Sequence, residues 1–147
     1  VSLIPSYGPE MRGGTANCGV PLSDREIGSP LIQHPEVLVA MNGPSLDRFC
    51  GDVVPGGTIY YNSSMITEPP ERTDVVRVPV AANEIADGLG NPKVANMVVL
   101  GAMLAGSATI SKEAILAALP SVVKGKPELI ELNRRALDAG MEAFVVA

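Results

Sequence analysis

The chain has 147 residues, enough for one domain with a real core, and 46% of them are hydrophobic, which excludes a disordered protein. Aromatic residues make up only 3%, so Val, Ile, Leu, Ala and Met must build that core. The net charge of −5 argues against broad binding to nucleic acid or anionic membranes, because both require a basic surface.

Short strands separated by turns are predicted for the first half of the chain. The run Val37 to Met41 has no polar position, which is typical of a parallel strand buried on both faces. Pro79 places the last strand at an edge, or ends it. The candidate strands are Val1 to Ile4, Asn17 to Leu22, Val37 to Met41, Thr58 to Asn62 and Val75 to Val80.

A short helix is predicted between the third and fourth strands, which makes a βαβ unit. Pro44 suits its first position and Gly51 its end, so the helix would run from Pro44 to Cys50. Asn42, directly before it, is read as a turn or cap residue unless it serves a site.

The second half is predicted to be helical, with a cap residue before each of three helices. The predicted helices are Glu84 to Leu89 capped by Asn83, Pro92 to Ala105 capped by Asn91, Lys112 to Leu119 capped by Ser111, and Pro127 to about Phe144. Pro120 should end the third of these helices, and Gly140 should weaken the last by about 1 kcal/mol. The uncharged stretch Val94 to Ile110 is short and partly polar for a membrane span, so a buried helix is expected.

These elements predict an α/β fold in which a three-layer α/β/α Rossmann-like open sheet has helices on both faces and the C-terminal half is helical. A single domain over residues 1–147 is expected, with no internal repeat.

No self-contained active site is visible in the sequence. Nucleotide-binding, zinc-protease and serine-hydrolase motifs are missing, and the single histidine, His34, is read as solvated or structural. Cys18 and Cys50 lack metal-type spacing, and no metal site is expected. We expect buried free thiols in a reducing cytosol, although a disulfide between the two stays open. Without a recognisable signal peptide, a cytoplasmic location is expected.

The run from Ser6 to Gly14 combines a phenol, a carboxylate, a guanidinium and three glycines in one turn. Glycines allow close approach of a partner to the backbone, and loops of this kind usually serve a site or an interface. The alternative is an exposed turn with a weak surface pair between Glu10 and Arg12.

Polar residues also follow two of the predicted strands. Asn42 comes after Met41, and Asn62, Ser63 and Ser64 follow Tyr61. Because the carboxyl ends of parallel strands line one crevice, these groups and the Ser6 to Gly14 loop are expected to converge on one edge. Each group taken alone is equally compatible with an ordinary turn.

Six stretches of the chain together resemble a known family: Ser6 to Cys18, Ile27 to Pro30, Met41 to Leu46, Tyr61 to Ser64, Val80 to Ala86 and Gly90 to Met97. Through them nearly the whole chain resembles the gamma subunit of 2-oxoacid:ferredoxin oxidoreductases. Members of that family usually begin with a strand and a Gly-Phe-Gly-Gly-Gln-Gly-like turn that opens a helix. This sequence does not contain that turn, so an omitted N-terminal segment is expected.

The resemblance implies a non-catalytic subunit that packs beside thiamine-bearing subunits and helps to form the coenzyme A entry. The complex would use thiamine diphosphate with Mg, iron–sulfur clusters and coenzyme A, none of them bound by this chain alone. The partners would be alpha, beta and delta-type subunits, with ferredoxin as electron acceptor and no nucleic acid or membrane span. The candidate cofactor-side residues are Ser6, Tyr7, Gly8, Glu10, Arg12, Gly13, Gly14, Asn42 and Asn62.

Two other functions remain compatible with the residues. The chain could be a free-standing Rossmann-like coenzyme- or nucleotide-binding module, or a purely structural interaction subunit. The sequence does not distinguish pyruvate, 2-oxoglutarate and branched-chain oxoacids as the substrate of the implied complex.

Overall fold

The computed structural model describes residues 4–7, 16–29 and 31–147. The chain forms two compact units, Val1–Pro35 and Glu36–Ala147.

The first unit contains a two-stranded antiparallel sheet of β1 (Ile4–Tyr7) and β2 (Ala16–Gly19), with Ile4 opposite Gly19 and Tyr7 opposite Ala16. The second strand begins one residue before the predicted Asn17 and ends at Gly19 rather than at Leu22. Of the first predicted strand only Ile4 lies in the described part, where it begins β1.

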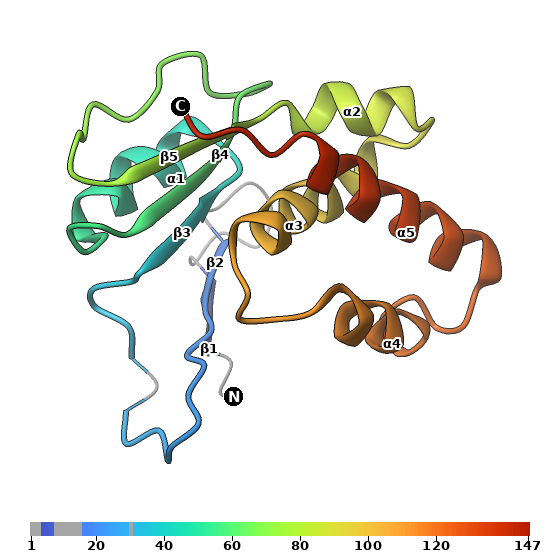
Figure 1. Cartoon of the computed structure of the whole chain (residues 1–147), viewed down its shortest axis with the longest axis horizontal. Coiled ribbons are helices and arrows are strands. Elements are labelled where there is room, and N and C mark those ends of the chain that lie inside the picture. The colour runs from blue at the N-terminus through green and yellow to red at the C-terminus, as the bar shows by residue number, and fades with distance from the viewer. Residues whose placement is uncertain (1–3, 8–15, 30) are drawn as a thin grey trace. The chain divides into compact units, whose positions relative to one another are not determined.

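The second unit is built on a parallel sheet with the order β3-β4-β5 (Figure 1). Its strands are β3 (Val37–Ala40), β4 (Thr58–Asn62) and β5 (Val76–Val80). Val37 lies opposite Thr58, and Thr58 opposite Val76, so all three strands start at the same level. The predicted βαβ unit and the edge position of the strand containing Pro79 are confirmed.

Helix α1 (Gly43–Phe49) covers one face of this sheet. The predicted stop at Gly51 is wrong, because the chain continues into the 3-10 turn η1 (Cys50–Asp52) before extending at Val53. The buried residues on this face come from α1, β3, β4 and the loops before and after β4: Ala40, Leu46, Val53, Ile59, Tyr61, Ile66 and Val75.

The opposite face is covered by helices of the C-terminal half: α2 (Ala82–Gly88), α3 (Ala95–Gly106), which follows the 3-10 turn η2 (Pro92–Val94), and α5 (Pro127–Glu142). Tyr60, Val78 and Val80 of the sheet pack against α3 residues such as Val98 and Ala102. The helices on both faces confirm the predicted α/β fold with a helical C-terminal half.

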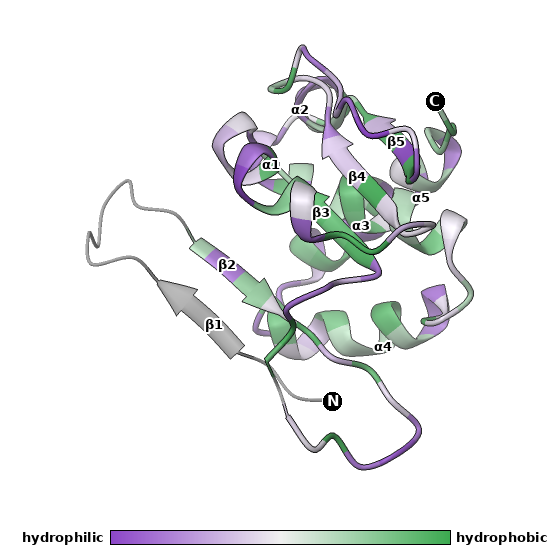
Figure 2. Cartoon of the chain, turned by 90° about the vertical axis from the view of Figure 1, so that its left-hand side faces the viewer, coloured by the Kyte–Doolittle hydropathy of each residue, from purple (hydrophilic) through white to green (hydrophobic). Residues whose placement is uncertain are grey.

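Helix α3 lies within the uncharged stretch Val94 to Ile110, and the part of it visible in Figure 2 is mostly hydrophobic. Six of its residues are buried in the protein core: Ala95, Val98, Val99, Gly101, Ala102 and Leu104. Within the described residues, no helix is both long and apolar enough to cross a membrane.

Glycines allow α3 and α5 to approach closely. A Cβ atom on Gly140 would lie 1.9 Å from the Val98 carbonyl oxygen, and one on Gly101 would lie 2.2 Å from the Leu137 carbonyl oxygen. Real Cβ atoms do not approach oxygen so closely, so both positions require glycine at this helix separation. Gly140 lowers the intrinsic stability of α5, but it allows the backbones of α3 and α5 to come into contact.

Helix α4 (Lys112–Val122) continues through Pro120, where the sequence predicted an end. A proline removes one backbone donor and tends to bend a helix, yet Val123 still donates to the Leu119 carbonyl oxygen beyond it. Leu119 is buried against Leu104 of α3 and Leu137 of α5, which holds this end of α4 in the fold.

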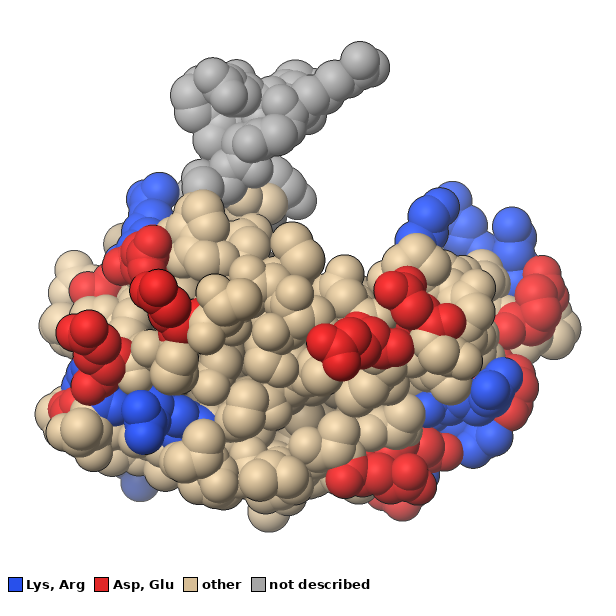
Figure 3. Space-filling model, turned by 90° about the horizontal axis from the view of Figure 1, so that it is seen from above, with Lys and Arg blue, Asp and Glu red and all other residues tan. Residues whose placement is uncertain are grey.

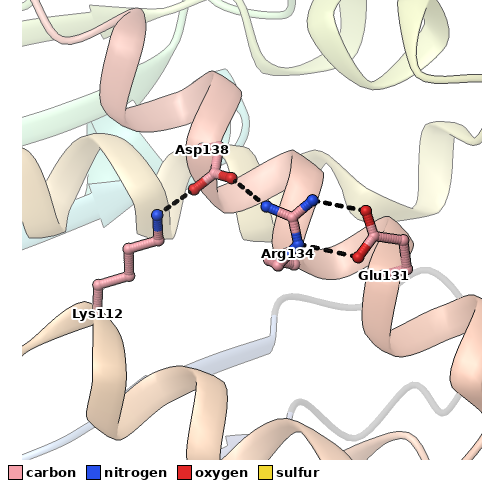
Figure 4. Close-up of polar contacts among 4 residues, drawn as sticks. All are labelled: Lys112, Glu131, Arg134 and Asp138. Carbon is pink, nitrogen blue, oxygen red and sulfur yellow. Dashed lines mark hydrogen bonds and ion pairs between the residues drawn. The ribbon is translucent and has the colours of Figure 1, made fainter.

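A chain of ion pairs ties the start of α4 to α5 (Figure 4). Lys112 Nζ lies 2.5 Å from Asp138 Oδ1, and Arg134 bridges Asp138 and Glu131 at 2.8 and 2.6 Å. These side chains are partly exposed, so solvent screens the pairs and each adds little to stability. The hydrogen bond to Arg134 is the main reason why the pKa of Glu131 is lowered.

The two outer strands of the sheet, β3 and β5, differ in the hydrogen bonds made along their outer edges. Along β5, the C-terminal Ala147 donates a hydrogen bond of 2.9 Å to the Arg77 carbonyl oxygen. Strand β3 pairs only with β4 among the described residues, and Val37 and Val39 are 44% and 41% exposed. The expectation that this strand is buried on both faces is therefore wrong, because it lies at the edge of the sheet.

Candidate functional site

Three asparagines lie at the carboxyl ends of the parallel strands, one after each strand. Asn42 follows β3, Asn62 ends β4, and Asn83 comes three residues after β5. Asn62 is 1% exposed. Its Nδ2 donates to the Met41 carbonyl oxygen at 3.3 Å and to Asn83 Oδ1 at 2.7 Å. The central asparagine therefore connects the segments that follow both neighbouring strands.

Asn42 is the N-cap of α1. Its backbone is extended, and its Oδ1 accepts a hydrogen bond from the Ser45 backbone N–H at 3.0 Å. This satisfies one of the donors that a helix leaves free in its first turn. The Asn42 side chain is exposed at the sheet edge, but its oxygen is already used by the helix.

The turn after β4 is fixed by backbone hydrogen bonds. The Asn62 carbonyl oxygen accepts from the backbone N–H of Met65 at 3.0 Å and of Ile66 at 2.9 Å. Ser63 donates its N–H to the Val80 carbonyl oxygen, and Ser64 Oγ accepts from the Glu84 N–H at 3.3 Å. The turn is thus joined to both the end of β5 and the start of α2.

The structure brings together two of the predicted site residues, Asn42 and Asn62, at this edge. Ser6 and Tyr7 belong to β1 in the other compact unit. The remaining predicted residues, Gly8, Glu10, Arg12, Gly13 and Gly14, lie outside the described residues.

Asn83 is a site residue that the sequence analysis missed. It was predicted to cap a helix, but Ala81 occupies the N-cap position of α2, and the Asn83 side chain bonds Asn62 instead. The signal that indicates Asn42 and Asn62 is a polar residue at the carboxyl end of a parallel strand, and Asn83 after β5 carries the same signal.

The three segments at this edge carry no positive charge. Residues 41–46, 62–66 and 81–86 contain no Lys or Arg, and their only ionisable side chain is that of the exposed Glu84. On the face shown in Figure 3, Lys and Arg side chains lie toward two sides, and the surface between them is uncharged except for a few acidic side chains. The described edge therefore offers neutral amides and hydroxyls.

A separate groove of about 320 Å³ lies on the α1 side of the sheet, and none of the predicted site residues line it. It is lined by Leu46, Asp47, Cys50 and the segment Glu68 to Glu71.

Arg72 follows the groove segment Glu68 to Glu71 and links it to the backbone after α1. Its guanidinium pairs with Asp74 and donates to the carbonyl oxygens of Cys50 and Val53 at 3.0 and 2.6 Å. The hydrogen bond to Arg72 lowers the pKa of Asp74, and burial raises the pKa of the Cys50 thiol. The hydrogen bonds from Arg72 to the two carbonyl oxygens tie η1 and the segment after it to the loop before β5.

Neither cysteine is fully buried, contrary to the expectation. Cys18 in β2 is exposed and Cys50 is half-buried, and both are free thiols. In the part of the chain that the structure describes, no three His, Cys, Asp or Glu side chains are grouped so that they could hold a metal ion.

Comparison with known proteins gives one consistent result. The sequence model of the family described as pyruvate ferredoxin/flavodoxin oxidoreductase matches residues 1–143. The chain is 43% identical to the ketoisovalerate oxidoreductase subunit VorA of Methanothermobacter thermautotrophicus, over 96% of this chain and 29% of VorA. It is 36% identical to the 2-oxoglutarate synthase subunit KorC of Methanothermobacter marburgensis, over 95% of this chain and 77% of KorC. The chain thus spans less than a third of one relative and about three quarters of the other.

Two solved structures share the fold. The gamma subunit of a keto/oxoacid ferredoxin oxidoreductase from Geobacter sulfurreducens matches with a TM-score of 0.75 at 31% identity, over 97% of this chain and 78% of that one. A 2-oxoglutarate:ferredoxin oxidoreductase from Magnetococcus marinus, with 2-oxoglutarate, coenzyme A and succinyl-CoA bound, matches with a TM-score of 0.80 at 20% identity. That match covers 99% of this chain and 26% of the Magnetococcus chain.

Proposed function

The chain belongs to the pyruvate ferredoxin/flavodoxin oxidoreductase family, and from this premise we propose that it is the gamma-type part of a 2-oxoacid:ferredoxin oxidoreductase. In the proposed reaction the 2-oxoacid loses CO2, its acyl group passes to the thiol of coenzyme A, and the two electrons released pass to ferredoxin. The observation that carries the proposal is the likeness to the Geobacter gamma subunit, which covers 97% of this chain at 31% identity.

Within such a complex we propose that this chain contributes no redox centre. Among the described residues no three His, Cys, Asp or Glu side chains are grouped to hold a metal ion, and the two cysteines cannot supply the four ligands of an iron–sulfur cluster. Thiamine diphosphate with Mg and the clusters would therefore be held by alpha, beta and delta-type partner subunits. The complex would work in the cytoplasm, where ferredoxin accepts its electrons.

Coenzyme A is the cofactor that this chain would help to hold. The neutral donors at the carboxyl ends of β3, β4 and β5 fit an uncharged part of such a ligand, because a buried or half-buried amide must find a partner. By the resemblance, the Ser6–Gly14 loop would line the interface toward the active centre of the complex. Arg12 would meet a phosphate or carboxylate of the ligand with two parallel hydrogen bonds.

The first experiment is purification of the tagged chain from its native host, with iron and thiamine diphosphate measured in what accompanies it. We expect partner subunits with both cofactors, and reduction of ferredoxin that depends on coenzyme A and on one acid of an oxoacid panel. A chain that purifies alone, without iron or thiamine diphosphate, would refute the subunit proposal and favour a free-standing binding module.

The same complex tests the loop. Replacing Arg12 by Ala should raise the KM for coenzyme A while the KM for the oxoacid stays unchanged, since only the former ligand would lose a charged contact. Full activity with unchanged KM values would remove Arg12 from the site and leave the subunit assignment intact.

A further inference from the structure

The hydrogen bonds of Asn62 determine how Asn83 is oriented. One side-chain atom of Asn62 lies 3.3 Å from the Met41 carbonyl oxygen. A carbonyl oxygen only accepts, so this atom must be the amide nitrogen of Asn62. The same nitrogen lies 2.7 Å from the Asn83 side chain, which must therefore present its oxygen toward Asn62.

The amide nitrogen of Asn83 then points away from Asn62. Asn83 is half-buried, and within the described residues its Nδ2 donates no hydrogen bond, although the atom is not among those fully shielded from solvent. On the other side of the pair, Asn62 Oδ1 is buried without a partner in the described part of the chain. Burying the Asn62 amide with an unsatisfied oxygen costs free energy, and a functional role for the amide would explain why this costly group is present.

The neighbouring groups indicate what kind of ligand Asn83 would bind. Ser64 Oγ accepts from the Glu84 N–H, which leaves its own proton free to donate, and no Lys or Arg lies in the three segments at this edge. Neutral donors next to the carboxylate of Glu84 do not favour a phosphate. They suit a neutral acceptor such as an amide carbonyl.

We propose that Asn83 donates a hydrogen bond from Nδ2 to an amide carbonyl of the pantetheine arm of coenzyme A, and that Asn62 is the residue that positions it. The proposal rests on the proposed function, which supplies coenzyme A as the ligand. The pantetheine arm carries amide carbonyls and no charge, whereas the nucleotide half carries the phosphates.

The test uses the intact complex and the substitution Asn83→Asp, which keeps an oxygen for Asn62 and removes the donor. The dissociation constant for coenzyme A, measured by calorimetry, should rise about three- to tenfold, as expected for one neutral hydrogen bond. The affinity for adenosine bisphosphate, the nucleotide half alone, and the KM for the oxoacid should not change. Asn91→Asp is the matched control, because Asp also caps the turn that Asn91 caps by accepting from the Lys93 N–H.

A second variant tests the positioning role. Asn62→Asp removes the donor that holds Asn83, so the double variant with Asn83→Asp should bind coenzyme A no more weakly than Asn62→Asp alone. The melting temperature of each complex shows whether the variant is folded, and Asn83→Asp alone decides the proposal if Asn62→Asp does not fold.

Two results would overturn the assignment: an unchanged affinity for coenzyme A in Asn83→Asp, or an equal loss of affinity for adenosine bisphosphate, which would place the contact at a phosphate. A wild-type complex that reduces ferredoxin with an oxoacid but does not bind coenzyme A would contradict the proposed function as well. The wild-type measurement therefore separates the two failures.

Discussion

β3 and β4 are neighbouring parallel strands, and the more polar of the two is the more deeply buried. β3 consists of aliphatic residues only, whereas β4 contains Thr58, two tyrosines and Asn62. In β4 every residue after Thr58 is buried, whereas in β3 only Ala40 is buried and Val37 and Val39 are over 40% exposed. β4 has a strand on either side and helices over both faces; β3 has one neighbour among the described residues. The comparison shows that position in the sheet, rather than composition, determines burial.

The largest effect is expected in the central strand. Ile59 is fully buried in β4, so Ile59→Ala should lower the free energy of unfolding by about 3 kcal/mol, from lost apolar burial and the cavity left behind. Urea unfolding followed by circular dichroism measures this value. An effect below about 1 kcal/mol would mean that the core around β4 is loosely packed, which contradicts the comparison.

An intermediate effect is expected in the helices that cover β4. Gly140→Ala places a Cβ 1.9 Å from the Val98 carbonyl oxygen, so α3 and α5 must separate, at a cost of about 2 kcal/mol. Gly88→Ala in α2 is the control, since nothing lies within 4 Å of its added Cβ. That variant should be neutral or slightly more stable, because Ala favours helix. Equal melting temperatures for the two variants would show that close approach does not require Gly140.

The smallest effect is expected at the edge strand. Val39 is 41% exposed, so Val39→Ala should lower the free energy of unfolding by only about 0.5 kcal/mol. The same urea titration compares it directly with Ile59→Ala. A loss as large as that of Ile59→Ala would mean that another segment covers β3 in solution.

Part of the candidate site could be predicted from the sequence. Polar residues after apolar strands indicated Asn42 and Asn62, and parallel pairing brings both to one edge. The pairing of Asn62 with Asn83 could not be predicted, because it depends on how α2 starts after β5. The role of the Ser6–Gly14 loop remains a prediction.

The sequence by itself determined the types of the elements and most of their starts. Apolar runs gave the strands, and local capping by Asn91 and Ser111 gave helix starts, because both signals act within a few residues. Only the tertiary structure decided that β3 lies at an edge, that Pro120 stays inside α4, and that Gly140 is needed for backbone contact. These outcomes depend on neighbours distant in sequence, whose packing outweighs local preference.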